Sequence, residues 1–143
     1  MVFYEKVLYT NIIILSYTMK EATKKKILIL EDEKPLAHAL ELKFAHEGFD
    51  VITSDNGELG LSILSKENFD MVLSDLIIPG VNGFGVLESI RDKKMKVPVI
   101  IMTNLNQEED RKRAFDLGAV DFFVKSNSTL SEIVEGVKKK IAK

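Results

Sequence analysis

The sequence predicts an α/β fold in which a doubly wound, five-stranded parallel sheet carries helices on both faces. Three observations support this prediction: short apolar runs, longer helical patterns between them, and the strict alternation of the two. Parallel strands that are buried on both faces read as nearly continuous runs of Val, Ile and Leu. Strict alternation of strands and helices is typical of open α/β sheets.

The predicted elements follow one another without a long linker. The strands are KILIL (26–30), DVITS (50–54), MVLS (71–74), PVIIM (98–102) and DFFV (121–124). The helices are expected at 35–46, 58–66, 84–93, 108–117 and 129–142. Pro35 suits the first turn of the first helix, and Gly48 and Gly118 come directly after the ends of two others.

Composition excludes several kinds of chemistry. The chain has no cysteine, so disulfides, zinc–thiolate sites and thiol nucleophiles are excluded. Twenty basic residues against 22 acidic residues leave a net charge of −2, and we expect no direct binding of nucleic acid. With 143 residues, of which 45% are hydrophobic and 29% charged, the chain fits one globular domain.

The first 23 residues are interpreted as an N-terminal extension that precedes a domain at residues 24–143. Their most apolar patch, residues 12–15, is short, whereas a membrane-spanning helix needs about 20 apolar residues. We therefore expect no membrane span, and the alternatives are an added strand or a weak contact with a membrane or a partner. Removal of residues 1–18 is expected to leave a folded domain.

Polar residues follow four of the five predicted strands. Glu31 and Asp32 follow the first strand, Asp75 the third, Thr103 the fourth and Lys125 the fifth. In doubly wound sheets, ligands bind outside these carboxyl ends of the strands. Taken singly, Asp32 could cap a helix and Lys125 could protect a sheet edge. Their occurrence at the same end of the sheet favours one shared site.

The residue types in this site indicate a metal and a phosphoryl group. Three converging acids repel one another unless a cation lies between them, and oxygen ligands suit Mg²⁺. A lysine and a hydroxyl beside the acids supply a positive charge and a hydrogen-bond donor for phosphoryl oxygens. The sequence therefore predicts a divalent-cation site at which phosphoryl chemistry takes place.

Four motifs then identify a family resemblance. They are the acidic pair Glu31-Asp32, the segment MVLSDLIIPGVNG with Asp75, IMT ending in Thr103, and GAVDFFVK ending in Lys125. In this order they resemble a response-regulator receiver domain of two-component signalling. The resemblance covers the chain except its N-terminal extension. It implies a flavodoxin-like sheet with strand order 2-1-3-4-5.

The resemblance implies a role for each acid. Asp75 is the implied phosphoacceptor, whose carboxylate attacks a phosphohistidine. Asp32, Asp75 and the backbone carbonyl of Ile77 are the implied Mg²⁺ ligands. Glu31 is implied to act mostly through metal-bound water.

It also implies a switch. By this resemblance, Lys125 is implied to pair with the phosphoryl group, and Thr103 is implied to move in and bond a phosphoryl oxygen. Phe122 occupies the place of the aromatic switch residue. Its position is then read on a surface made by the helix at 108–117, the strand at 121–124 and the helix at 129–142.

Partners and alternatives follow from the same resemblance. We expect a stand-alone cytoplasmic receiver, not a turnover enzyme, that takes phosphate from a sensor histidine kinase or a phosphotransfer protein. Its downstream target is a protein, and a homodimer through the helices at 108–117 and 129–142 is an option. One alternative is a pseudo-receiver that binds partners without phosphorylation. Another is a Mg²⁺-dependent phosphatase, although Ile77 stands where it needs a second acid.

The chain departs from the family pattern at several positions. Glu31 replaces the commoner aspartate, and Phe122 lacks the hydroxyl of the frequent tyrosine. Ser126 follows Lys125 where proline is usual, and a cis bond before serine costs about 2.5–4 kcal/mol. The loop therefore either carries that strain or takes another course. Asn104 stands where a smaller residue is usual, so restricted access for small phosphodonors is expected.

Two further departures concern hydrolysis. Ile77 and Leu105 lie two positions beyond the implied phosphoacceptor and the implied threonine, and both are apolar. In the family, these side chains flank the water that removes the phosphoryl group. Because neither can orient water, slow self-dephosphorylation is expected.

Overall fold

A five-stranded parallel sheet forms the centre of the computed structural model, which describes residues 2–22 and 24–142. The strands are β1 (Lys26–Leu30), β2 (Asp50–Ser54), β3 (Met71–Ser74), β4 (Val99–Thr103) and β5 (Asp121–Val124). Their order across the sheet is β2-β1-β3-β4-β5, and each neighbouring pair is parallel. This order confirms the predicted doubly wound, flavodoxin-like fold.

The helices lie within one residue of the predicted ends, except for a helix in the N-terminal extension. They are α1 (Val2–Ala22), α2 (Lys34–His46), α3 (Gly57–Lys66), α4 (Gly83–Asp92), α5 (Glu108–Asp116) and α6 (Leu130–Ile141), and η1 (Lys125–Asn127) is a 3₁₀ turn. The side chains of Asn56, Asn82 and Thr129 accept hydrogen bonds from the first turns of α3, α4 and α6. These caps define where the three helices begin.

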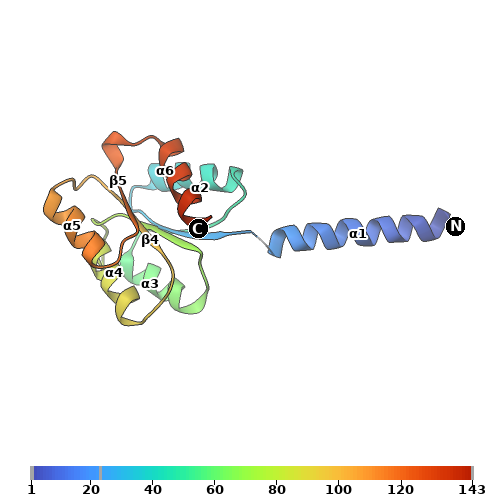
Figure 1. Cartoon of the computed structure of the whole chain (residues 1–143), viewed down its shortest axis with the longest axis horizontal. Coiled ribbons are helices and arrows are strands. Elements are labelled where there is room, and N and C mark those ends of the chain that lie inside the picture. Colours follow the sequence, from blue (N-terminus) through green and yellow to red (C-terminus); the bar gives the residue numbers. More distant parts are fainter. Residues whose placement is uncertain (1, 23, 143) are drawn as a thin grey trace.

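Helices cover both faces of the sheet (Figure 1). Ile27 and Ile29 of β1 contribute to a core shared with α2 and α6. Leu28 and Leu30 contribute to a second core, shared with α3, α4 and α5. All four side chains are fully buried. Alternation of side chains along a strand explains why an unbroken apolar run serves both cores.

Strand β4 begins one residue later than predicted and ends on Thr103. Pro98 has no N–H group, so it cannot donate to a ladder, although its carbonyl accepts from the N–H of Val72 at 2.9 Å. The shift makes Thr103 the last residue of the strand, opposite Val124 of β5. Thr103 is therefore held by the sheet and is fully buried.

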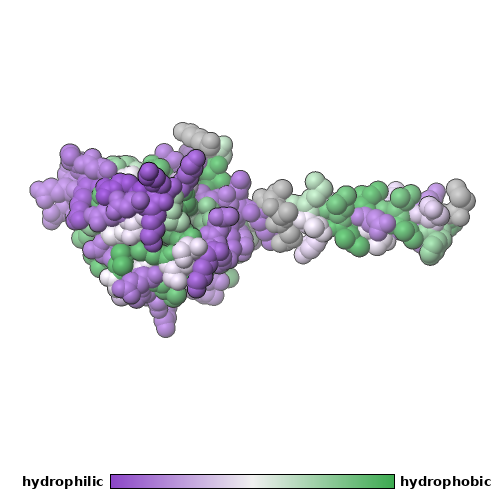
Figure 2. Space-filling view, turned by 90° about the horizontal axis from the view of Figure 1, so that it is seen from below, coloured by the Kyte–Doolittle hydropathy of each residue, from purple (hydrophilic) through white to green (hydrophobic). Residues whose placement is uncertain are grey.

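The N-terminal extension forms helix α1, which projects from the domain (Figure 1). The alternative of an added strand is therefore wrong. Large apolar side chains along α1 are exposed, among them Phe3, Ile12 and Leu15, and Figure 2 shows a hydrophobic band around this helix. Within residues 2–22 and 24–142, no helix combines the length and apolar character that crossing a membrane requires.

Candidate functional site

The register of the sheet brings the carboxyl ends of its strands to one edge. Leu30 at the end of β1 pairs with Ser74 at the end of β3, and Thr103 of β4 pairs with Val124 of β5. Beyond the ladder, the N–H of Asp75 donates to the carbonyl of Leu30 at 3.0 Å. The residues that follow β1, β3 and β5 are therefore neighbours, although they are far apart in the sequence.

Asp75 is a buried acid whose two carboxylate oxygens are both engaged. It is 5% exposed. Its Oδ2 accepts a hydrogen bond from Lys125 Nζ at 2.6 Å, and its Oδ1 accepts one from the N–H of Ile77 at 3.1 Å. A buried carboxylate is costly unless it is paired in this way. Asp75, which interrupts an apolar run, therefore lies where a lysine and a backbone N–H stabilise its charge.

Lys125 links two acids across the site. Its Nζ lies 2.6 Å from Asp75 Oδ2, 2.6 Å from Glu31 Oε2 and 3.9 Å from Glu33 Oε1. The contact with Glu31 is an ion pair without hydrogen-bond geometry, because Glu31 Oε2 accepts no hydrogen bond among the described residues. The Lys125 side chain is only 9% exposed, so it points into the site and does not protect the edge of the sheet.

Burial and charge shift two pKa values in this cluster. Burial raises the pKa of Glu31, and the contacts with Lys125 and with the N–H of Glu33 offset this only in part. Burial lowers the pKa of Lys125, but its hydrogen bond to Asp75 and its contact with Glu31 outweigh burial, so the net shift is upward. Lys125 is therefore held as a cation between the two acids.

Three acids offer a site for a divalent cation. Glu31, Asp32 and Asp75 each present a carboxylate oxygen, and these atoms lie within 4.8 Å of one another. Oxygen ligands of this kind suit Mg²⁺. The buried Glu31 Oε2 accepts no hydrogen bond among the described residues, and its partner is a cation, Lys125 Nζ at 2.6 Å. Asp32 does not serve as the cap of α2, because the residue at that position is Glu33.

A pocket of about 190 Å³ opens beside these acids and is called the carboxyl-end pocket below. It is lined by Asp32, Glu33, Asp75, Ile77, Thr103, Asn104 and Lys125. Thr103 Oγ1 accepts a hydrogen bond from the N–H of Leu105 at 3.3 Å, which leaves its own proton free to be donated. The Ile77 side chain is 59% exposed at the pocket, whereas Leu105 packs against the core.

Phe122 lies apart from the carboxyl-end pocket. It is 5% exposed and belongs to the core under α3, α4 and α5. The guanidinium of Arg111 on α5 lies 5.4 Å from the centre of the Phe122 ring and 5.3 Å from that of Phe115. In this structure the aromatic ring is therefore packed inward, beneath a cation of α5.

Sequence reasoning missed two features of the site. Glu33 lines the pocket near Lys125 and is recognisable in the sequence only as another acid after β1. Ser126 donates its N–H to Asn104 Oδ1 at 3.0 Å, which joins two loops. The Lys125–Ser126 peptide is trans, and the chain turns through η1 instead, so the loop takes another course.

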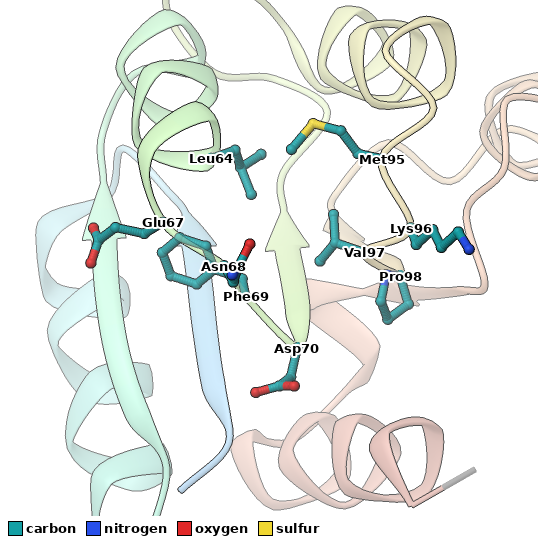
Figure 3. Close-up of a pocket in the computed structure, with 9 residues that line it drawn as sticks. All are labelled: Leu64, Glu67, Asn68, Phe69, Asp70, Met95, Lys96, Val97 and Pro98. Carbon is teal, nitrogen blue, oxygen red and sulfur yellow. The ribbon is translucent and has the colours of Figure 1, made fainter. Parts of the chain in front are cut away.

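A second and larger pocket, of about 520 Å³, lies at the opposite end of the sheet and is called the amino-end pocket (Figure 3). It is lined by Leu64, Glu67, Asn68, Phe69, Asp70, Met95, Lys96, Val97 and Pro98. Figure 3 shows Leu64, Met95 and Val97 pointing toward one another. The charged ends of Glu67 and Lys96 point away from them.

Comparison with known proteins identifies the family. Residues 27–138 match the response regulator receiver domain. The chain belongs to this family. The acidic cluster of this receiver is typical of the family's Mg²⁺ site, and membership implies a kinase partner in two-component signalling.

Relatives agree with this assignment. The chain is 39% identical over 102 residues to the probable transcriptional regulator ycf27 of Porphyridium aerugineum, covering 71% of this chain and 42% of that protein. It is 34% identical over 100 residues to the cell cycle response regulator CtrA of Brucella ovis, covering 70% and 43%. The receiver thus spans less than half the length of these curated relatives.

Solved structures share the fold. The non-phosphorylated HemR receiver domain from Leptospira biflexa superposes with a TM-score of 0.78 at 28% identity, covering 84% of this chain and 96% of that one. The receiver domain of the Francisella response regulator 1452 superposes with a TM-score of 0.79 at 24% identity, covering 83% and 98%.

Proposed function

We propose that Asp75 accepts a phosphoryl group from a sensor histidine kinase or a phosphotransfer protein, with Mg²⁺, and that the phosphorylated receiver signals through protein–protein contact. One observation carries this proposal. The buried Asp75 lies 2.6 Å from Lys125 Nζ and presents an oxygen within 4.8 Å of those of Glu31 and Asp32. Members of this family are generally not turnover enzymes.

The chemistry is a transfer between two nucleophiles. A carboxylate oxygen of Asp75 attacks the phosphorus of a phosphohistidine, a P–O bond forms, and the P–N bond breaks. The leaving imidazole takes up a proton, and Asp75 becomes an acyl phosphate. Asp32, Asp75 and the backbone carbonyl of Ile77 would hold Mg²⁺, with Glu31 nearby, and the bound ion would supply positive charge to the phosphoryl oxygens.

Lys125 and Thr103 stabilise the transferred group. In the unphosphorylated receiver Lys125 pairs with Asp75 and Glu31, and on phosphorylation its Nζ shifts to a phosphoryl oxygen. Thr103 Oγ1 has a free proton and lines the same pocket, so it donates to a second phosphoryl oxygen. Both donors contact the phosphoryl oxygens, where negative charge develops during the transfer. Positioned donors stabilise the transition state most at such atoms.

The signal leaves through α5, β5 and α6. Movement of Thr103 toward the phosphoryl group leaves space on the path from the pocket to Phe122. The Phe122 ring, which now packs under Arg111, is the bistable element that reports this change to the surface. The hydroxyl-free ring works by packing, and the downstream partner contacts the surface formed by these three elements.

The test is phosphoryl-analogue binding in matched variants. Wild type is expected to bind beryllofluoride in the presence of Mg²⁺ and to be labelled by phosphoramidate, and Asp75→Asn is expected to do neither. Asp70→Asn is the control, because Asp70 lies at the amino-end pocket. Absence of beryllofluoride binding in wild type would overturn the proposal and favour the pseudo-receiver.

A further inference from the structure

Two loops beside the carboxyl-end pocket are joined by one hydrogen bond, in which the N–H of Ser126 donates to Asn104 Oδ1 at 3.0 Å. Asn104 directly follows Thr103 at the end of β4. Ser126 directly follows Lys125 at the end of β5. Each partner of the bond is thus the chain neighbour of a residue proposed to hold a phosphoryl oxygen.

The geometry explains why this bond forms. Ser126 lies in η1, and the first N–H groups of a 3₁₀ turn have no acceptor inside the turn. Asn104 supplies that acceptor from a loop 22 residues earlier in the chain. A proline at position 126 has no N–H and could not form the bond. The two departures from the family pattern, at 104 and 126, are therefore the two partners of one contact.

We propose that Asn104 is a positioning residue that couples the Thr103 loop to the Lys125 loop through the Ser126 N–H. This proposal rests on the proposed function, since it concerns the same phosphoryl site. Thr103 and Lys125 approach the phosphoryl group from neighbouring strands, and the bond makes their backbones move as one unit. Without it, each loop has to be ordered separately when the phosphoryl group is bound.

A double-mutant cycle tests the coupling. Beryllofluoride binding with Mg²⁺ is measured by calorimetry for wild type, Asn104→Ala, Ser126→Pro and the double variant. Each single change is expected to weaken binding about fivefold, the cost of ordering roughly one more residue when beryllofluoride binds. The double variant is expected to bind no more weakly than either single variant, because both remove the same contact.

Two controls separate the hydrogen bond from other effects. Ser126→Ala keeps the backbone N–H and is expected to bind beryllofluoride as wild type does. Asn106→Ala removes an exposed asparagine of the same loop and is expected to have no effect. If Ser126→Pro fails to fold, exchange of the Ser126 amide proton, measured without beryllofluoride, still reports the contact. This exchange is expected to be faster in Asn104→Ala than in wild type.

The outcomes are distinct. If wild type binds beryllofluoride and Asn104→Ala binds it equally well or more tightly, the coupling is wrong and Asn104 acts only on access to the pocket. The coupling is also wrong if the losses of beryllofluoride affinity multiply in the double variant. It is wrong as well if the exchange rate of the Ser126 amide proton is unchanged in Asn104→Ala. If wild type itself binds no beryllofluoride, the proposed function fails first and the role of the contact fails with it.

Discussion

The two ends of the central sheet each carry a pocket, and they differ in how their charges are held. At the amino end, Lys26 Nζ lies 2.6 Å from Glu67 Oε1, with side chains that are 24% and 42% exposed. At the carboxyl end, Lys125 and Glu31 are separated by the same 2.6 Å, but their side chains are 9% and 0% exposed. The same kind of ion pair is thus solvated at one end and buried at the other.

This difference shows that volume is a poor guide to function here. The amino-end pocket, at about 520 Å³, is larger than the carboxyl-end pocket, at about 190 Å³. An acid at the amino end, Asp70, has its carboxylate satisfied by the N–H of Lys26 at 2.8 Å. At the carboxyl end the buried acids Glu31 and Asp75 share one lysine, so charge is concentrated where water is scarce. Electrostatic interactions are stronger in such a place.

The largest expected effect is at the buried lysine. Lys125→Met is expected to lower the rate of phosphorylation of Asp75 by at least about 100-fold, because a charged donor to the phosphoryl group is lost. Lys26→Met at the amino end is expected to leave that rate unchanged and to cost about 0.2–1 kcal/mol of stability, as a solvated pair does. Phosphoramidate labelling and thermal unfolding measure the two quantities. Equal labelling of both variants would show that the buried lysine matters no more for phosphorylation than the solvated one.

The next effect concerns water at the carboxyl-end pocket. Ile77→Asn is expected to speed loss of the phosphoryl group roughly tenfold, less than a full general base contributes, because a polar side chain can orient the attacking water. Ile77 is 59% exposed, so the change leaves the fold intact. Val120→Asn, an exposed apolar residue just before β5, is the control. A dephosphorylation rate that does not rise in Ile77→Asn contradicts the predicted role of Ile77.

A smaller effect is expected where the backbone packs closely under Asp75, and it is an effect on stability. A Cβ at Gly83 would overlap the carbonyl oxygen of Asp75 and lie 2.7 Å from Leu76 Cα. Gly83→Ala is therefore expected to cost about 1–3 kcal/mol in unfolding free energy and to weaken beryllofluoride binding. For Gly85→Ala, two residues on, the nearest atom is Val81 Cγ1 at 2.6 Å, so a side chain and not the backbone has to shift and a smaller loss of stability is expected. Chemical denaturation compares the unfolding free energies of the two variants. Equal values would mean that the backbone around Asp75 shifts to make room for the added methyl group.

The smallest effect is expected from α1, which joins the domain just before the amino end of β1. Removal of residues 1–18 is expected to shift the thermal midpoint by less than about 2 °C, which corresponds to under about 1 kcal/mol. Beryllofluoride binding is expected to be unchanged. A large fall in the midpoint would show that α1 stabilises the domain.

Much of this molecule could be predicted from local patterns. Apolar runs predicted all five strands, and the helices from Lys34 onward lie within one residue of their expected ends. The positions of Glu31, Asp75 and Lys125 could be inferred because parallel strands end at one edge of a sheet. The course of the loop at Ser126 could not, since a departure from the family pattern left two backbone paths open. The helical state of α1 was missed because its apolar residues have no clear helical face.

The sequence alone determined the order of the elements, the two buried faces of the strands and which residues stand at the strand ends, because these depend on local periodicity and on chain connectivity. Only the tertiary structure decided that Lys125 lies 2.6 Å from two acids and that Asn104 bonds Ser126. The partners of Lys125 are 50 residues or more away in the chain, so their separation is set by strand register and helix packing. Tertiary packing also gave Asp75 its burial, and with it the reason for a charge inside an apolar run.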